Sequence, residues 1–185
     1  MNALDHFILT VADWTAPITI VDPDQPDSPL IFVNRAFETL SGYSADNVKG
    51  HNCRFMQGDQ PRDEQETDRL KACLKAKTAT SVCIPNETAS GRRFYNYLHV
   101  APLRLHDRIL LVGTQFEVTP LAYMSYLRVA AEQRPLIDQG FDDKDEYITM
   151  IQSLELRHKA LARLFRTYAA MSKIKANAEN KGVSG

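Results

Sequence analysis

The pattern of the chain changes at Thr119 and Pro120. Before this point, short runs of β-branched and aromatic residues alternate with turn residues, which is typical of strands. After it, no strand pattern occurs, and apolar residues recur every three or four positions, as in helices. We therefore expect an N-terminal helical cap over residues 1–17, a core over 18–118 and a helical extension over 119–185.

The order of the expected elements indicates an α+β core, in which an antiparallel sheet carries helices on one face. The five expected strands span residues 18–21, 30–33, 80–85, 94–103 and 109–118. Helices are expected over residues 2–13, 64–76, 121–134 and 145–175, with two short helices capped by Asn34 and Ser44. A turn is expected over Glu87–Arg92. Gly113, inside the last strand, indicates close approach of a ligand to the backbone.

Composition excludes several classes of function. The formal net charge of -1 gives no general attraction to nucleic acid or to an anionic membrane. Cys53, Cys73 and Cys83 lack CxxC spacing, which argues against a metal site and a disulfide scaffold. We find neither a signal-peptide pattern nor an apolar run long enough to span a membrane. Together these features predict a reduced, cytoplasmic setting.

The segment Gly50–Gly58 holds the most reactive combination of side chains in the chain. It places the thiol of Cys53 beside the guanidinium of Arg54 and the amides of Asn52 and Gln57. A thiol next to a cation and amides is a candidate nucleophile. Free cysteines are also commonly buried as small apolar residues. Residue types alone support these two interpretations equally.

Gly50–Gly58 closely resembles the GxNCRFLQ segment of the LOV (light-oxygen-voltage) flavin photoreceptors, which belong to the PAS superfamily. The resemblance extends from about Ile18 to Val118 and includes Asp22-Pro23 and Phe32–Phe37. It also includes three amides that the LOV family places on successive strands, namely Asn86, Asn96 and Gln115. The family implies a PAS fold with a five-stranded antiparallel sheet, and the chain resembles a short LOV protein with a C-terminal helical extension.

The resemblance implies FMN as the cofactor, although other flavins suit the same residues. Amides both donate and accept hydrogen bonds, so they can bind a flavin edge without adding charge. The implied contacts are Asn86 and Asn96 at the pyrimidine edge, Asn52 and Gln57 at the ribityl chain, Arg54 at the phosphate, and Leu98, Val100, Leu111, Gly113 and Gln115 around the ring. Lys71 stands where many members have a second arginine, and it would neutralise phosphate as a point charge.

By resemblance, Cys53 is the reactive residue. In LOV proteins, blue light excites the flavin, the thiol bonds to flavin C4a, and N5 becomes protonated. Gln115 would face N5 and O4, and its amide would flip when N5 gains the proton. The adduct breaks thermally. The resemblance therefore implies a reversible switch rather than an enzyme.

The helical extension has an apolar seam from Ile148 to Tyr168 that a lone helix could not bury, which predicts a homodimer. The signal would pass through these helices to a signalling partner. The segment around His158 also resembles the phosphoacceptor helix of HWE/HisKA2 histidine kinases. His158 therefore has two interpretations, a candidate phosphoacceptor in a phosphotransfer protein or degenerate kinase fragment, and a polar residue that fixes helix register. The chain carries no ATP-binding signature. A PAS redox or ligand sensor without photochemistry, with Cys53 as the sensing thiol, is a further alternative.

Overall fold

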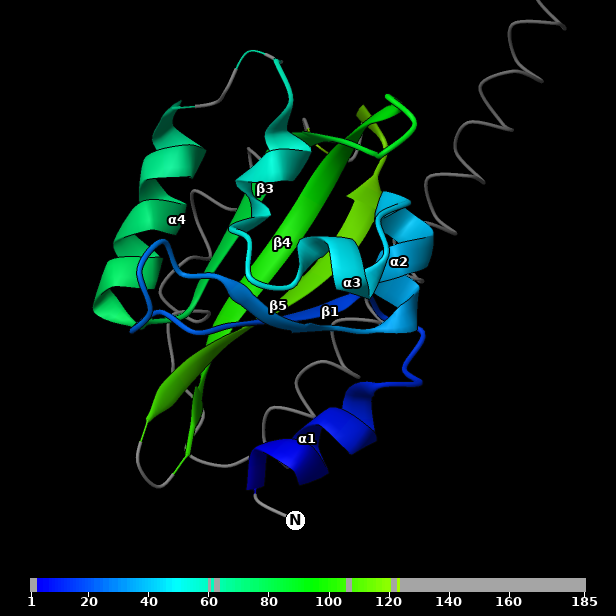
Figure 1. Ribbon diagram of the computed structural model, residues 1–185. Coiled ribbons are helices and arrows are strands. Elements are labelled where there is room, and N and C mark those ends of the chain that lie inside the picture. Colours follow the sequence, from blue (N-terminus) through cyan, green and yellow to red (C-terminus); the bar gives the residue numbers. More distant parts are fainter. Residues whose placement is uncertain (1–2, 60, 62–63, 106–107, 121–122, 124–185) are drawn as a thin grey trace, which may run out of the picture. The chain divides into compact units, whose positions relative to one another are not determined.

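The computed structural model describes residues 3–59, 61, 64–105, 108–120 and 123 (Figure 1). All of them belong to the first of two compact units, Met1–Ile148. The helices expected over 121–134 and 145–175 lie outside the described residues, apart from Tyr123. The apolar seam and His158 lie outside them as well.

The sheet has five strands in the order β2-β1-β5-β4-β3. All neighbouring strands pair antiparallel. The strands are β1 (Ile18–Val21), β2 (Leu30–Val33), β3 (Thr80–Glu87), β4 (Arg93–Arg104) and β5 (Ile109–Val118). The last of the described strands, β5, therefore lies in the centre of the sheet. The expected α+β fold with a five-stranded antiparallel sheet is confirmed.

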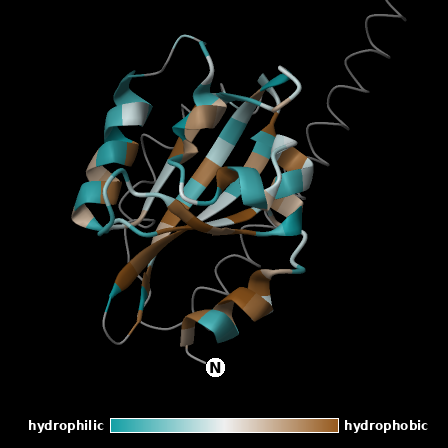
Figure 2. Cartoon of the chain, viewed as in Figure 1, coloured by the Kyte–Doolittle hydropathy of each residue, from teal (hydrophilic) through white to brown (hydrophobic). Residues whose placement is uncertain are grey.

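Helical segments cover one face of this sheet (Figure 1). They are α2 (Arg35–Ser41), α3 (Ala45–Val48), the 3-10 helix η1 (Cys53–Gln57) and α4 (Glu64–Ala76). All four come from the stretch between β2 and β3. Much of α4 is coloured as hydrophilic in Figure 2, whereas the strands contain long hydrophobic stretches. The contrast is that of a surface helix packed on a half-buried sheet.

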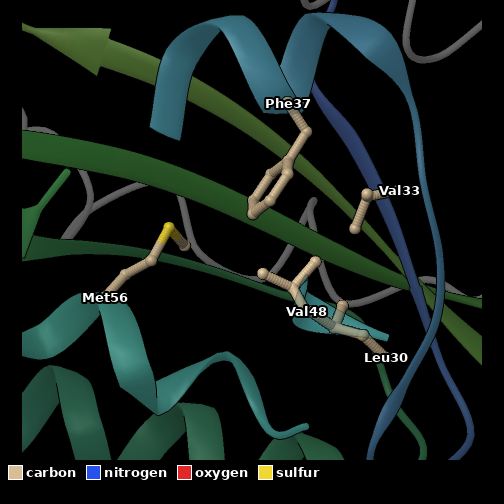
Figure 3. Packing of buried hydrophobic residues seen from close by; sticks show 5 residues of the cluster. All are labelled: Leu30, Val33, Phe37, Val48 and Met56. Carbon is tan, nitrogen blue, oxygen red and sulfur yellow. The ribbon is translucent and has the colours of Figure 1, made fainter. Parts of the chain in front are cut away.

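A buried cluster joins the β1–β2 hairpin to the short helices. Its members come from β2, α2, α3 and η1, and their side chains point toward one another (Figure 3). They are Leu30, Val33, Phe37, Val48 and Met56. Burying each large side chain contributes about 1.5–3 kcal/mol of stability relative to exposure. Phe55 packs beside the cluster, edge to face with Tyr43 at a centroid distance of 4.9 Å. The cluster therefore fixes η1 against the hairpin.

Asn34 connects the N-terminal segment to the hairpin and α2. Its Oδ1 accepts hydrogen bonds from the backbone N–H of Phe37 (3.0 Å) and of Ile18 (2.9 Å). Its Nδ2 donates to the carbonyl oxygens of Val11 (3.1 Å) and Ala16 (2.9 Å). The side chain is both the expected N-cap of α2 and the anchor of the segment after α1 (Ala3–Val11).

Several boundaries differ from the sequence prediction. Helix α1 ends at Val11, earlier than expected. Strand β3 continues through Asn86 to Glu87, so the turn begins at Thr88. The strand accommodates Pro85 because β3 lies at the edge of the sheet, where a missing N–H removes no essential ladder bond.

Among the described residues, no helix combines the length and the apolar character that crossing a membrane requires.

Candidate functional site

Hydrogen bonds to β2 and an asparagine cap position the Gly50–Gly58 segment. The N–H of Gly50 donates to the carbonyl oxygen of Leu30 (2.8 Å), and the N–H of Leu30 donates to that of His51 (2.9 Å). Asn52 then caps η1, because its Oδ1 accepts from the N–H of Arg54 at 3.0 Å. Cys53 is thus the first residue of a short helix that is fixed at its start.

A cavity lies between the sheet and the helical layer. Its lining residues come from β1, the β1–β2 loop, the segment Asn52–Gln57, α4 and the three long strands, and they are Thr19, Val21, Ser28, Asn52, Cys53, Arg54, Met56, Gln57, Leu70, Leu74, Ile84, Asn86, Asn96, Leu98, Val100, Leu111, Gly113 and Gln115. Apolar walls with a few convergent polar groups are typical of small-molecule sites. Arg54 is the single charged side chain among these lining residues.

Strand register explains how residues distant in the sequence meet in this cavity. Successive side chains of a strand point to opposite faces, so Asn96, Leu98 and Val100 of β4 share one face. On β5, Gln115 is the direct partner of Leu98, and Gly113 is the direct partner of Val100. These five residues, all predicted as cofactor contacts, therefore line the same side of the sheet.

Three amides form a hydrogen-bonded cluster on this face. Nδ2 of Asn96 donates to Oδ1 of Asn86 at 2.8 Å and to Oε1 of Gln115 at 2.9 Å. All three side chains are buried, each with 1% of its surface exposed. Buried amides are costly unless they are hydrogen-bonded, and here they satisfy one another in part.

One atom of the cluster lacks a partner. Oδ1 of Asn96 is buried and accepts no hydrogen bond within the part of the chain that the structure describes. A buried, unsatisfied acceptor costs about 1–3 kcal/mol. A ligand with an N–H donor would remove this cost. The imide edge of a flavin carries such a donor between two carbonyl acceptors, so the donor set suits a flavin.

Cys53 provides the only thiol among the residues that line the cavity. It is half-buried, and burial raises the pKa of its thiol from 9.0 to about 12. The thiol therefore remains protonated at neutral pH. Cys73 and Cys83 are buried elsewhere, and the thiol of Cys73 donates to the carbonyl oxygen of Thr78 at 2.9 Å. Burial, together with the charge of Glu66, raises the pKa of Cys83 to about 12.

Arg54 reaches the cavity edge from η1, and its guanidinium forms an ion pair with Asp27 of the β1–β2 loop. Lys71 lies elsewhere. It is exposed on α4, pairs with Asp68 at 2.9 Å, and is not one of the described residues that line the cavity. The contact of Asp27 was not predicted, because nothing in a turn sequence indicates which distant cation its aspartate will contact.

Gly113 lies in a narrow part of the cavity wall. A Cβ atom built at this position would lie 2.6 Å from Oγ1 of Thr19 and 3.3 Å from Cδ1 of Leu98. The sequence predicted close approach of a ligand here. The structure adds that protein side chains already occupy the space next to the glycine, so a larger residue would displace them.

The sequence matches the PAS domain family over residues 15–120. It is 33% identical over 141 residues to a blue-light-activated histidine kinase of Brucella anthropi, which covers 75% of this chain and 28% of the kinase. The chain thus spans less than a third of the length of the curated relatives it matches.

Solved structures of LOV domains are similar to this one, and two of them illustrate the similarity. The LOV domain of the blue-light-activated histidine kinase EL346 of Erythrobacter litoralis has 39% identity and a TM-score of 0.53, with 56% of this chain and 95% of that domain covered. A Light-Oxygen-Voltage domain studied with a flavin analogue has 28% identity and a TM-score of 0.61, with 71% and 96% covered.

The match to the PAS domain family covers more than half of the chain, and the five-stranded antiparallel sheet agrees with it. The chain belongs to the PAS domain family. Within that family its core is of the LOV type, with the Asn52–Gln57 segment and the three amides around one cavity.

Proposed function

We propose that the protein is a blue-light sensor that binds FMN in the cavity and switches through Cys53. The observation that carries the proposal is the combination of a protonated thiol with an amide cluster in one cavity, where Oδ1 of Asn96 lacks a partner. The names of the relatives, which describe blue-light activation, support the same function.

The residues of the cavity have distinct roles in this proposal. Asn86 and Asn96 would bind the edge of the flavin ring, and apolar residues such as Leu98 and Val100 would form the walls beside it. Asn52 and Gln57 bind the ribityl chain, and Arg54 binds the phosphate. A bound flavin supplies absorption of blue light and an electrophilic carbon. Cys53 would supply the sulfur for a bond to that carbon and the proton for flavin N5.

Gln115 couples this chemistry to the protein. It lies on the central strand of the sheet, and Oε1 accepts a hydrogen bond from Asn96. An amide that changes from donor to acceptor reverses the hydrogen bonds it makes, so protonation at flavin N5 would change the contacts of β5. The residues after β5 then carry the signal to a homodimer interface in the helical extension.

An absorption spectrum before and after blue light tests the proposal. The wild-type protein should bind a flavin, lose its blue absorption band under illumination and recover it in darkness. Cys53→Ala should keep the flavin and the band but not lose the band. The matched control is Cys73→Ala, which removes a buried thiol outside the cavity and should bleach like the wild type. Wild-type protein that binds flavin and never bleaches would contradict the switch, and release and chromatography of the flavin would identify FMN.

A second candidate function is histidine phosphotransfer at His158. It is favoured by the names of the relatives, which describe blue-light-activated histidine kinases, together with the resemblance of the segment around His158 to a phosphoacceptor helix. Incubation with a partner histidine kinase and labelled ATP should give an acid-labile phosphoryl label that His158→Ala abolishes. Labelling that persists in this variant would remove the candidate.

A further inference from the structure

We propose that Asp27 is a positioning residue that holds the Arg54 guanidinium at the cavity edge, ready for the phosphate of a flavin nucleotide. The inference rests on the proposed function and extends it, because it concerns how the protein distinguishes FMN from riboflavin, which lacks the phosphate. It assigns this selectivity to a loop far from the amide cluster in sequence.

The first observation is that Asp27, Asn52 and Arg54 each contact the other two. The Asn52 side chain accepts from the N–H of Arg54 at 3.0 Å and donates to the carbonyl oxygen of Asp27 at 2.6 Å. The third contact joins Arg54 to Asp27, because Nη1 and Nη2 of the guanidinium both donate to Oδ1 of Asp27. The β1–β2 loop and the start of η1 are therefore joined at this point.

The second observation is the backbone conformation of the loop. Asp27 and Ser28 are consecutive residues with positive φ, at 68° and 46°. This region is unfavourable for residues other than glycine, so two consecutive residues held there need support from their surroundings. Ser28 lines the cavity, and the contacts of Asp27 hold the loop in this conformation. Strained backbone maintained by side-chain contacts at a cavity is a recurrent property of binding sites.

The third observation is the charge distribution around the cavity. Arg54 is the single charged residue among those described as lining it, so any phosphate group bound there would depend on this one cation. An arginine has five N–H donors. Contact with a single carboxylate oxygen leaves donors for a second anion. A free arginine side chain loses rotamer entropy when it is fixed, and the contact with Asp27 removes part of that cost before the ligand binds.

Asp27 also carries a negative charge, which opposes phosphate binding. Its side chain is 57% exposed, and water and salt screen the repulsion at such positions. We therefore expect positioning to outweigh repulsion. Positioning of Arg54 would strengthen phosphate binding and charge repulsion would weaken it, so removal of the Asp27 carboxylate shows which effect is larger.

The experiment compares Asp27→Ala with Asp24→Ala in the full chain, after removal of bound flavin. Asp24 belongs to the same loop, pairs with Lys77 and is 56% exposed, so its removal changes the loop charge equally without affecting Arg54. Dissociation constants for FMN and for riboflavin are measured separately by quenching of flavin fluorescence. Asp27→Ala should weaken FMN binding by roughly three- to tenfold and leave riboflavin binding unchanged. Asp24→Ala should change neither.

Four results would overturn the inference. Tighter FMN binding by Asp27→Ala would mean that Asp27 competes with the phosphate. If Asp27→Ala changed the dissociation constants for FMN and riboflavin equally, Asp27 would have a packing role. If Asp27→Ala and Asp24→Ala changed FMN binding equally, the effect would come from the charge of the loop alone. Equal affinity of the wild type for FMN and riboflavin would mean that Arg54 does not recognise phosphate. By contrast, wild-type protein that binds neither flavin would refute the proposed function itself. In an Arg54→Ala background, Asp27→Ala should have no further effect on FMN binding.

Discussion

At the scale of single residues, Asn34 shows how one polar side chain can organise three segments. Its two amide atoms contact the end of α1, the start of β1 and the first turn of α2. The residue is buried, with 2% of its surface exposed. The sequence predicted only the cap, because contacts with Val11 and Ala16 depend on the path of the chain before β1.

Replacement of Asn34 by Ala should lower the free energy of unfolding by about 2–4 kcal/mol, since it removes a helix cap and leaves buried backbone groups without partners. Urea denaturation of the flavin-free protein measures the change. Asn47→Ala is the control, because Asn47 is exposed on α3. Equal losses in the two variants would show that the Asn34 contacts contribute little.

The raised pKa of Cys53 predicts its reactivity in the dark. In the folded, flavin-free protein, alkylation of Cys53 by iodoacetamide should continue to accelerate from pH 9.0 toward about 12, because the thiolate forms only in that range. In denatured protein the rate should level off near the ordinary cysteine value. Mass spectrometry resolves Cys53 from the other thiols. A plateau near pH 9.0 in folded protein would contradict the shift.

The same shift has a consequence for stability. A thiol whose pKa is higher in the folded state favours folding fully below the unfolded value. Its contribution disappears as pH rises through the folded value. Cys53→Ser should therefore reduce the loss of stability between pH 9.0 and about 12.

At the scale of elements, β5 shows what sequence patterns can and cannot predict. The bounds of β1, β2, α4 and β5 agree with the sequence prediction, because β-branched runs and helical spacing are local signals. The order β2-β1-β5-β4-β3 could not be predicted from such signals, since it depends on which edges pair. The end of β3 was also missed, because Asn86, the residue after the predicted strand, is of a type that strands usually avoid.

The site shows the same division. The motif and the amides were assigned through the family resemblance, and register places Asn96, Gln115 and their neighbours around one cavity. Thr19, Leu70 and Ile84 also line the cavity. Their positions in the sequence do not distinguish them from ordinary core residues. The pair between Arg54 and Asp27 joins residues from different elements, and it required the folded chain.

The contact of Gly113 on β5 with Thr19 on β1 gives a prediction for the sheet. Gly113→Ala should lower the free energy of unfolding by about 1–3 kcal/mol, because its Cβ would overlap Oγ1 of Thr19. The loss should be smaller when the substitution is made in a Thr19→Ala background. Denaturation of the four proteins of this double-mutant cycle measures the coupling. Equal losses in both backgrounds would exclude the overlap as the cause.

At the scale of the whole molecule, the proposed dimer depends on the seam from Ile148 to Tyr168. Leu154→Lys should reduce the molar mass in darkness from dimer to monomer, because the interface would then bury an unpaired charge. Gln152→Lys introduces the same charge beside the seam and should leave the mass unchanged. Size-exclusion chromatography with light scattering provides the measurement. A dimer that both variants retain would place the interface elsewhere.

The position of β5 beside β1 has a consequence for how such a domain can be built into larger proteins. Ile18, the first residue of β1, pairs with Thr114, and the N–H of Gln115 donates to the carbonyl oxygen of Pro17 at 3.0 Å. The chain therefore enters the sheet within a few residues of where it leaves it, at Val118. A domain whose two connections lie together can be inserted into a host protein at one point, and a local change at Gln115 would reach both linkers at once.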